Sequence, residues 1–426
     1  LVYPDRTPHT GLLEYKNVYR PVRVRSFDQE RGTLTLHNYM DFDDIQDFVD
    51  ICYEVTQDGL SVQKGKVVGA SAAPHSDCTV GLDIDVPTAG RVYLKLSYQL
   101  KKELPLVSAG HVLGFDELLL ENKDGRNQTA AKWTASDVEV SDIRVEEDDA
   151  WIVLNGDGFT YRLDKRTGLF SGLQYAGREY LNHPMELNIW RAPTDNDMYI
   201  RAEWEKAHYD EAYTRAYSEQ ILQNKFGVMI MCHAGVVAPT VQKLIDVEIM
   251  WKIDGAGRIA AGITAVKDEE LPDLPRFGIR MFLDKKLSEA AYYGMGPQES
   301  YRDKHRAASH GLFRSSVQEL HEDYIMPQEN GSHYDCDYVE LTNQRYGMAV
   351  AAEHTFSFNA SYYTQEVLTQ TKHNYELTEA DSTVLCIDHA QNGIGSNSCG
   401  PVVLDEYRFS EKEFRFDFTL VPFVRG

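Results

Sequence analysis

The sequence lacks an uninterrupted apolar run of about 18 residues, the length that a transmembrane helix requires, so we expect no membrane span. Basic residues are scarce as well. The chain has 43 Lys and Arg against 66 Asp and Glu, a formal net charge of −23. Nucleic acids and anionic membrane surfaces both attract basic patches, so this balance argues against either partner and leaves neutral or cationic small molecules.

Cysteine is also rare, with six residues in a chain of 426. None forms a Cys-x-x-Cys pair, and none has metal-finger spacing to a histidine. Six thiols are too few for a disulfide framework in a chain this long, so we expect reduced, buried thiols and a cytoplasmic protein. The residues concerned are Cys52, Cys78, Cys232, Cys336, Cys386 and Cys399.

Motifs for catalysis are absent too. There is no Gly-x-Ser-x-Gly elbow and no His-Glu-x-x-His helix. Gly294-Met295-Gly296 lacks the third glycine of a phosphate loop. Gln298–Asp303 supplies two carboxylates and an arginine, which predict a surface loop of paired charges rather than a general acid or base. Serine-hydrolase and zincin chemistry therefore have no motif support, and no metal-site spacing stands out among the histidines.

The chain is rich in features typical of β-strands: it has 25 tyrosines and many short segments in which apolar and polar residues alternate. In Val92–Leu100 every second residue is apolar, while Lys95, Ser97 and Gln99 lie between them, which predicts a strand with one buried face. Asn155-Gly156-Asp157-Gly158 predicts a hairpin. Glu203–His208 is the best helix candidate. The βαβ alternation of a parallel barrel is missing.

Length and pattern together predict two domains. About seven short strands before residue 120 are typical of an immunoglobulin-like β-sandwich, which we assign to residues 1–135. Glu121–Ser136 is polar and aperiodic and marks the boundary. Residues 136–426 contain at least twelve expected strands, including Val241–Ile253, and predict one large β domain. The fold class is therefore all-β.

The stretch Trp190–Asp197 concentrates an aromatic ring, an arginine, a proline and two carboxylates. Pro193 ends a strand, and Asp195 and Asn196 favour turns. Arg191 is either a ligand-facing donor or one half of an internal ion pair with an aspartate. Residue chemistry alone favours the ion pair, because structural pairs also cluster charge.

Six motifs recur in a fixed order that resembles the C-terminal part of bacterial β-galactosidases of glycoside hydrolase family 2. They are Leu1–His9, Trp190–Asp197, Leu274–Gly278, Tyr293–Tyr301, Pro327–Gly331 and Gly393–Gly395. The resemblance implies the immunoglobulin-like domain that follows the catalytic barrel, and then a large β-supersandwich related to galactose mutarotases.

The resemblance also implies a function. The family's acid/base and nucleophile glutamates lie in the barrel, upstream of Leu1, and this chain has no Asn-Glu dipeptide of the kind that often carries the acid/base glutamate. We therefore expect the non-catalytic C-terminal portion of a retaining β-galactosidase, a start at Leu1 inside a longer protein, and no turnover by the chain alone. The implied partners are the barrel portion, a galactoside at the active-site rim and further copies of the chain. The Mg²⁺ and Na⁺ that the family often uses belong to the barrel.

Two segments match the family's pocket rim. Met198–Glu205 matches a mobile loop beside the substrate. After the Gly-Ile-Gly turn, where better-known members place a tryptophan, this chain has Ser396–Pro401, with Cys399 near the tryptophan position and far less stacking area. The candidate substrate-binding residues are Arg191, Asp195, Asn196, Asp197, Asn397, Ser398 and Cys399.

Two alternatives remain open at this point. An independent carbohydrate-binding module would use Trp190, Tyr292 and Tyr293 as stacking platforms, although such rings are more often core residues. A stand-alone epimerase would need a histidine and a glutamate as acid and base, and no pair stands out.

Overall fold

The computed structural model describes residues 1–135, 142–240 and 243–425. The chain divides into two compact units, each described here by itself. The first contains Leu1–Gln128 with Gly296–Gln298 and His305–Leu312, and the second contains the rest. The predicted boundary after residue 135 abuts residues 136–141, which lie outside the described residues, so it stays a prediction.

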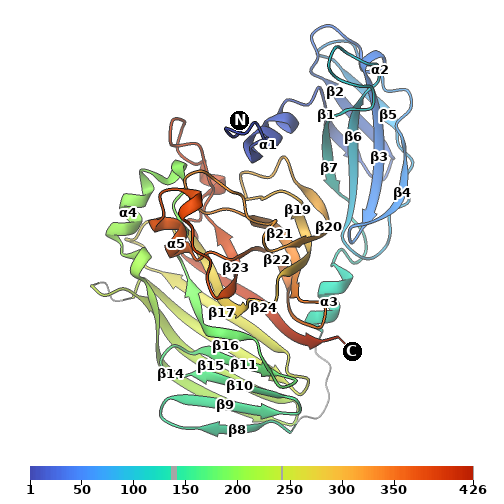
Figure 1. The fold of residues 1–426 in the computed structure, drawn as a ribbon. Coiled ribbons are helices and arrows are strands. Elements are labelled where there is room, and N and C mark those ends of the chain that lie inside the picture. Colours follow the sequence, from blue (N-terminus) through green and yellow to red (C-terminus); the bar gives the residue numbers. More distant parts are fainter. Residues whose placement is uncertain (136–141, 241–242, 426) are drawn as a thin grey trace. The chain divides into compact units, whose positions relative to one another are not determined.

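The first unit is an immunoglobulin-like sandwich of two antiparallel sheets (Figure 1). One sheet has the order β1 (Val22–Asp28), β2 (Thr33–Asn38) and β5 (Asp77–Gly81), and the other has β4 (Leu60–Lys66), β3 (Val49–Gln57), β6 (Val92–Leu100) and β7 (Val112–Leu119). Helices α1 (Thr10–Val18) and α2 (Ile45–Phe48) complete the unit.

Strand β6 shows why this sequence folds as a sandwich. Val92, Leu94, Leu96 and Tyr98 are fully buried between the sheets, as the alternation predicts. Tyr98 donates a hydrogen bond to Asp116 of β7, so the one phenol in this row keeps a partner inside the core.

The second unit has two sheets. The smaller has the order β12 (Arg178–Glu179), β11 (Leu169–Tyr175), β10 (Phe159–Asp164), β9 (Trp151–Gly156) and β8 (Arg144–Glu147). The larger has the order β13 (Leu181–Asn188), β18 (Arg276–Asp284), β23 (Ser382–Gln391), β22 (Tyr346–Ser361), β24 (Glu413–Val424), β17 (Ile259–Lys267), β16 (Ile245–Asp254), β15 (Gly227–Val237) and β14 (Tyr213–Asn224), with β19 (Glu289–Gly296), β20 (Ser309–Ser316) and β21 (Ser332–Thr342) off this path. Its helices are α3 (Gln128–Thr134), α4 (Ile200–Lys206) and α5 (Gln365–Gln370).

The two sheets of the second unit pack through one apolar core, and strands β9 to β11 lie against β14 to β16 (Figure 1). Trp251 of β16 is fully buried, meets the ring of Phe170 edge-on at 5.0 Å and donates to the carbonyl oxygen of Gly168 at 2.9 Å. The all-β prediction, a sandwich followed by a large supersandwich, is confirmed. Among the described residues, no helix is long and apolar enough to cross a membrane.

Several local predictions are also confirmed. The Asn155–Gly158 signal joins β9 to β10 as an antiparallel hairpin. The expected strand Val241–Ile253 appears as β16, although residues 241 and 242 lie outside the described residues.

Other local predictions were wrong. The polar segment Glu121–Ser136 contains α3, because Ala130 is buried and the Trp133 ring packs edge-on against Tyr338. Met198–Glu205, expected to be a loop, is helical from Ile200, because Trp204 is fully buried and donates to the carbonyl oxygen of Asp273 at 2.9 Å.

His333 in β21 gives the core a pH dependence. It is 1% exposed, stacks on Phe358 at 5.1 Å, and its Nδ1 lies 3.1 Å from the carbonyl oxygen of Met295. Burial lowers the pKa of His333 to about 4. An unfolded histidine takes up a proton near pH 6.5, so between these values the unfolded chain binds more protons and stability falls as the pH falls.

We therefore expect the free energy of unfolding to drop by roughly 3 kcal/mol between pH 6.5 and 4 on account of His333. His333→Gln keeps a neutral donor and should flatten this part of the pH profile in urea unfolding. His354→Gln, at an exposed position of β22, is the control and should leave the profile unchanged. An unaltered slope in His333→Gln would contradict the assignment.

Candidate functional site

The candidate site begins where β13 ends, at the loop Trp190–Asp197. Pro193 cannot continue the ladder, and the 3₁₀ turn η1 (Asp195–Asp197) starts two residues later. The Asp197 carboxylate accepts hydrogen bonds from the backbone N–H of Thr194 at 2.9 Å and from its hydroxyl at 3.1 Å. The side chain of Asp197 thus closes the turn on itself.

Arg191 pairs with Asp197, as the internal ion-pair interpretation predicts. Its Nε and Nη2 donate to the two carboxylate oxygens at 3.1 and 2.7 Å, and the side chain is 0% exposed. The same guanidinium donates to the carbonyl oxygens of Asn392 and Gly393. Arg191 therefore turns no donor toward solvent, and its structural effect is to join two loops.

A second buried arginine lies next to the first pair. Arg276, at the start of β18, donates from Nε to Asp388 at 3.0 Å and from Nη1 to Glu329 at 2.6 Å. The other oxygen of Glu329 accepts the backbone N–H of Ala192 at 3.1 Å. Glu329 thereby connects Arg276 to the loop that carries Arg191.

The electrostatics of this cluster follow from burial and pairing. Burial acts to lower the pKa of Arg276, but Asp388 and Glu329 outweigh it and hold that pKa well above the ordinary value. Burial raises the pKa of Asp388, although Arg276 opposes the rise. Arg276 therefore stays charged, and its charge keeps two carboxylates in a space that excludes water.

The segment Gln298–Asp303 belongs to the same arrangement and is not the surface loop that the sequence predicts. Glu299 is buried, bonds Lys304 and Tyr324, and accepts the backbone N–H of Gly331 at 2.9 Å. Burial alone would raise the pKa of Glu299, but Lys304 outweighs it and lowers that pKa. Asp303 accepts the backbone N–H groups of Ile394 and Gly395 at 2.9 and 2.7 Å.

These contacts bring together five of the six motifs. We call the assembly the motif cluster; it consists of Arg191, Asp197, Arg276, Glu299, Asp303, Glu329, Asp388 and the turn Asn392–Gly395. Sequence reasoning missed the roles of Arg276, Glu329 and Asp388. The available signal was a charge at the end of an otherwise apolar strand, as at Arg276 beside Phe277 and at Asp388 after Ile387.

The predicted site residues lie on the loops that the motif cluster holds. Asn196 donates to the carbonyl oxygen of Gly395 at 2.7 Å, and its Oδ1 accepts the hydroxyl of Ser398 at 2.7 Å. Asn196, Asp197 and Asn397 line a cavity of about 270 Å³. Asp195 and Cys399 are both exposed and do not line it.

Two expectations about side-chain exposure are resolved by the structure. Cys232, Cys336 and Cys386 are buried free thiols, but Cys399 is exposed on the turn after Ser398, so the prediction that all six are buried was wrong. Trp190, Tyr292 and Tyr293 are 5%, 1% and 0% exposed. None of these rings presents a face to a sugar.

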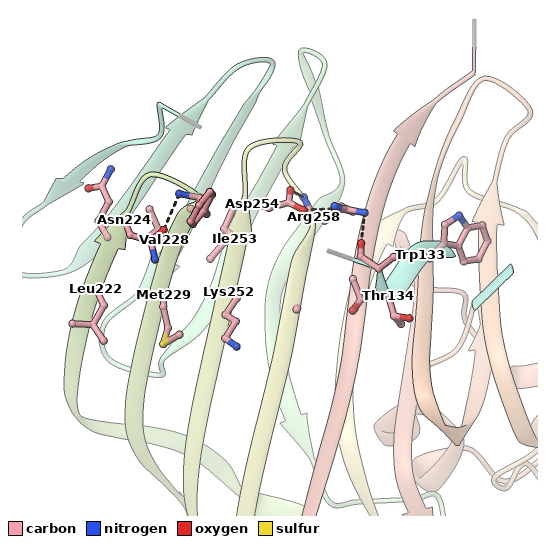
Figure 2. Close-up of a pocket in the computed structure, with 16 residues that line it drawn as sticks. Trp133, Thr134, Leu222, Asn224, Val228, Met229, Lys252, Ile253, Asp254 and Arg258 are labelled. Atoms are coloured by element: carbon pink, nitrogen blue, oxygen red, sulfur yellow. Dashed lines mark hydrogen bonds and ion pairs between the residues drawn. The ribbon is translucent and has the colours of Figure 1, made fainter. Parts of the chain in front are cut away.

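Another cavity, of about 520 Å³, lies elsewhere, beside β14 to β17. Figure 2 shows Arg258 bonded both to Asp254 and to the carbonyl oxygen of Ala135, the last described residue before 136. This cavity shares no lining residue with the motif cluster, so its size alone assigns it no function. Within residues 1–135, 142–240 and 243–425, no group of three or more His, Cys, Asp or Glu could hold a metal ion.

The fold and the motif cluster define an all-β chain with a sandwich and a supersandwich, and comparison with known proteins names its family. Residues 155–420 match the model of the β-galactosidase small chain, and residues 34–121 match β-galactosidase domain 4. The chain belongs to the β-galactosidase small-chain family, which confirms the resemblance of its motifs.

Curated relatives cover the chain from end to end. It is 42% identical to a β-galactosidase of Actinobacillus pleuropneumoniae and 30% identical to one of Staphylococcus xylosus, in each case over 99% of this chain. It covers only 41% and 42% of those proteins, so the chain spans about two fifths of their length. Among solved structures, a galactose 1-epimerase from Lactobacillus acidophilus aligns over 67% of this chain and 98% of its own, at 8% identity and a TM-score of 0.35.

The Arg191–Asp197 pair should be essential for stability. Arg191→Ala leaves a carboxylate buried without its partner, which costs about 3–5 kcal/mol of unfolding free energy. Arg201→Ala removes the exposed pair with Glu205, in which each side chain is 44% exposed, and should cost less than about 1 kcal/mol. Equal losses in the two variants, measured by urea unfolding, would contradict the buried-pair assignment.

Asn196 should order the turn that carries Cys399. Asn196→Ala removes the hydrogen bonds to Gly395 and Ser398, each worth about 1 kcal/mol, so backbone amides in 394–400 should exchange about tenfold faster or more. Asp195→Ala is the matched control, because the Asp195 carboxylate accepts no hydrogen bond from the described residues. Hydrogen-exchange mass spectrometry measures both, and equal protection in the two variants would refute the role of Asn196.

Proposed function

We propose that this chain is the non-catalytic C-terminal portion of a retaining β-galactosidase, an enzyme that hydrolyses terminal β-D-galactosides such as lactose. The observation that carries the proposal is the coverage: 99% of the chain matches, yet this is only about two fifths of either β-galactosidase. The catalytic carboxylate pair would be supplied by the remaining part of the enzyme, where two carboxyl groups about 5 Å apart act as nucleophile and acid/base.

The chain's own contribution would be to position the rim of the active site. The motif cluster holds the backbone of 190–197 and 392–395 through buried charges, while Asp195 and Cys399 remain exposed on the segments so held. Asp195 can accept a hydrogen bond from a sugar hydroxyl. Cys399 can offer only a small apolar contact, since a thiol has far less surface than an indole. We expect weak stacking on the acceptor sugar.

The partners under this proposal are the barrel portion, the galactoside at the rim and further copies of the chain. Metal ions would belong to the barrel portion alone. The three buried free thiols support a reducing compartment, and we place the protein in the cytoplasm.

The test is a chimera in which this chain replaces the matching two fifths of the Actinobacillus pleuropneumoniae enzyme. The isolated chain should not hydrolyse an aryl β-galactoside, and the chimera should do so. Asp195→Ala in the chimera should raise KM with little change in kcat, because it removes a substrate contact and not a catalytic group. Turnover by the pure chain, or a folded but inactive chimera, would overturn the proposal.

A further inference from the structure

A third cavity, of about 150 Å³, lies in the second unit among β21, β22 and β23. Its lining includes Ser332, Ser357 and Gln391, which are buried, and Arg302, His389 and Glu411, which are more exposed. It shares no lining residue with the 270 Å³ cavity beside Asn196. One ordered water needs about 10–15 Å³ by this kind of measure, so the cavity has room for a small organic molecule.

Gln391 forms the polar end of this cavity. The side chain is 5% exposed, and its Nε2 donates to Asp388 at 3.0 Å and to the Ser332 hydroxyl at 3.2 Å. The amide cannot be reversed, because its oxygen would then face the Asp388 carboxylate. Its Oε1 has no hydrogen-bond partner among the described residues.

An unpaired buried carbonyl oxygen costs about 1–3 kcal/mol unless a donor reaches it. The amide orientation is set by Asp388, which is itself bound by Arg276, so Gln391 cannot turn to relieve this cost. The cavity lining therefore includes a buried acceptor that is free to receive a hydrogen bond from a bound molecule.

The rest of the lining limits which molecule fits. Arg302 uses one guanidinium N–H on the carbonyl oxygen of Arg408 and brings a positive charge, while Asp335 and Glu411, the latter 3.3 Å from His389, bring negative ones. Mixed charge favours a neutral molecule over an ion. Ser357 can both donate and accept, and Phe356 offers an apolar face.

We propose that this cavity binds a small neutral polyhydroxylated ligand, a monosaccharide or a linear polyol, one of whose hydroxyls donates to Gln391 Oε1. A hydroxyl group both donates, as Gln391 Oε1 requires, and accepts, as Arg302 and Ser357 allow. The site is separate from the rim cavity and binds its ligand whether or not the chain completes a galactosidase.

Calorimetric titration of the 426-residue chain with galactose, and separately with glycerol, tests this proposal. At least one ligand should bind with a Kd of about 1 mM, typical of a few hydrogen bonds in a small site. Stronger binding of galactose identifies a monosaccharide site, and stronger binding of glycerol identifies a polyol site. No heat from either ligand overturns the proposal.

Variants locate the binding. Thr355→Phe fills the cavity from a half-buried position and should weaken binding at least tenfold. Gln391→Met removes Oε1 at nearly constant size and gives a second reading if Thr355→Phe does not fold. Arg144→Gln, at a position of β8 whose side chain is 78% exposed and lines neither cavity, should leave Kd unchanged. Equal binding by the wild type and a folded Thr355→Phe, or a crystal structure of the chain soaked in ligand that shows only water on Gln391, overturns the proposal.

Discussion

The motif cluster depends on one interaction: the buried guanidinium of Arg276 is shared by two buried carboxylates, those of Asp388 and Glu329. Arg276 has no exposed surface, and neither has Asp388. Charges so placed lose their hydration and are tolerated only when every one finds a partner with good geometry. The second carboxylate oxygen of Glu329 accepts the backbone N–H of Ala192. The need for paired charges therefore extends from the sheet into the loop that carries Arg191. Replacing Arg276 would leave Asp388 and Glu329 buried without the cation that they share.

This explains how irregular backbone can be buried beside a sheet. Loops carry N–H and C=O groups that need partners once water is excluded. Here side chains provide them: Arg191 binds the carbonyl oxygens of Asn392 and Gly393, and Asp303 binds the amides that follow. Gly393 has room only for hydrogen at this point, since a Cβ would stand 2.9 Å from Asp303 Oδ2. The turn therefore keeps one path without belonging to any strand.

The sequence predicted correctly the features that depend on residues close together along the chain. The alternation in Val92–Leu100 and the turn Asn155–Gly158 act over a few residues, and so does the Arg191–Asp197 pair, six residues apart. It failed for contacts between distant segments: Arg276 meets Glu329 across 53 residues and Asp388 across 112. The resemblance indicated which segments mattered but not that they touch. In α3 the contact of the partly buried Trp133 with Tyr338 overrode a polar local pattern in the same way.

The buried charges also separate two kinds of residue on the loops of the motif cluster. Arg191 and Asp197 are buried and make their hydrogen bonds to each other and to the backbone, so their side chains are not available to a ligand. Asp195 and Cys399 make few contacts of their own and are exposed, so they can change without cost to the fold. Under the proposed function, differences in acceptor preference would therefore arise at such exposed positions, while the arginines and carboxylates beneath them keep the backbone in place. A cysteine at position 399 fits this division, because the turn before it is held by Asn196 and Asp303 whatever side chain it displays.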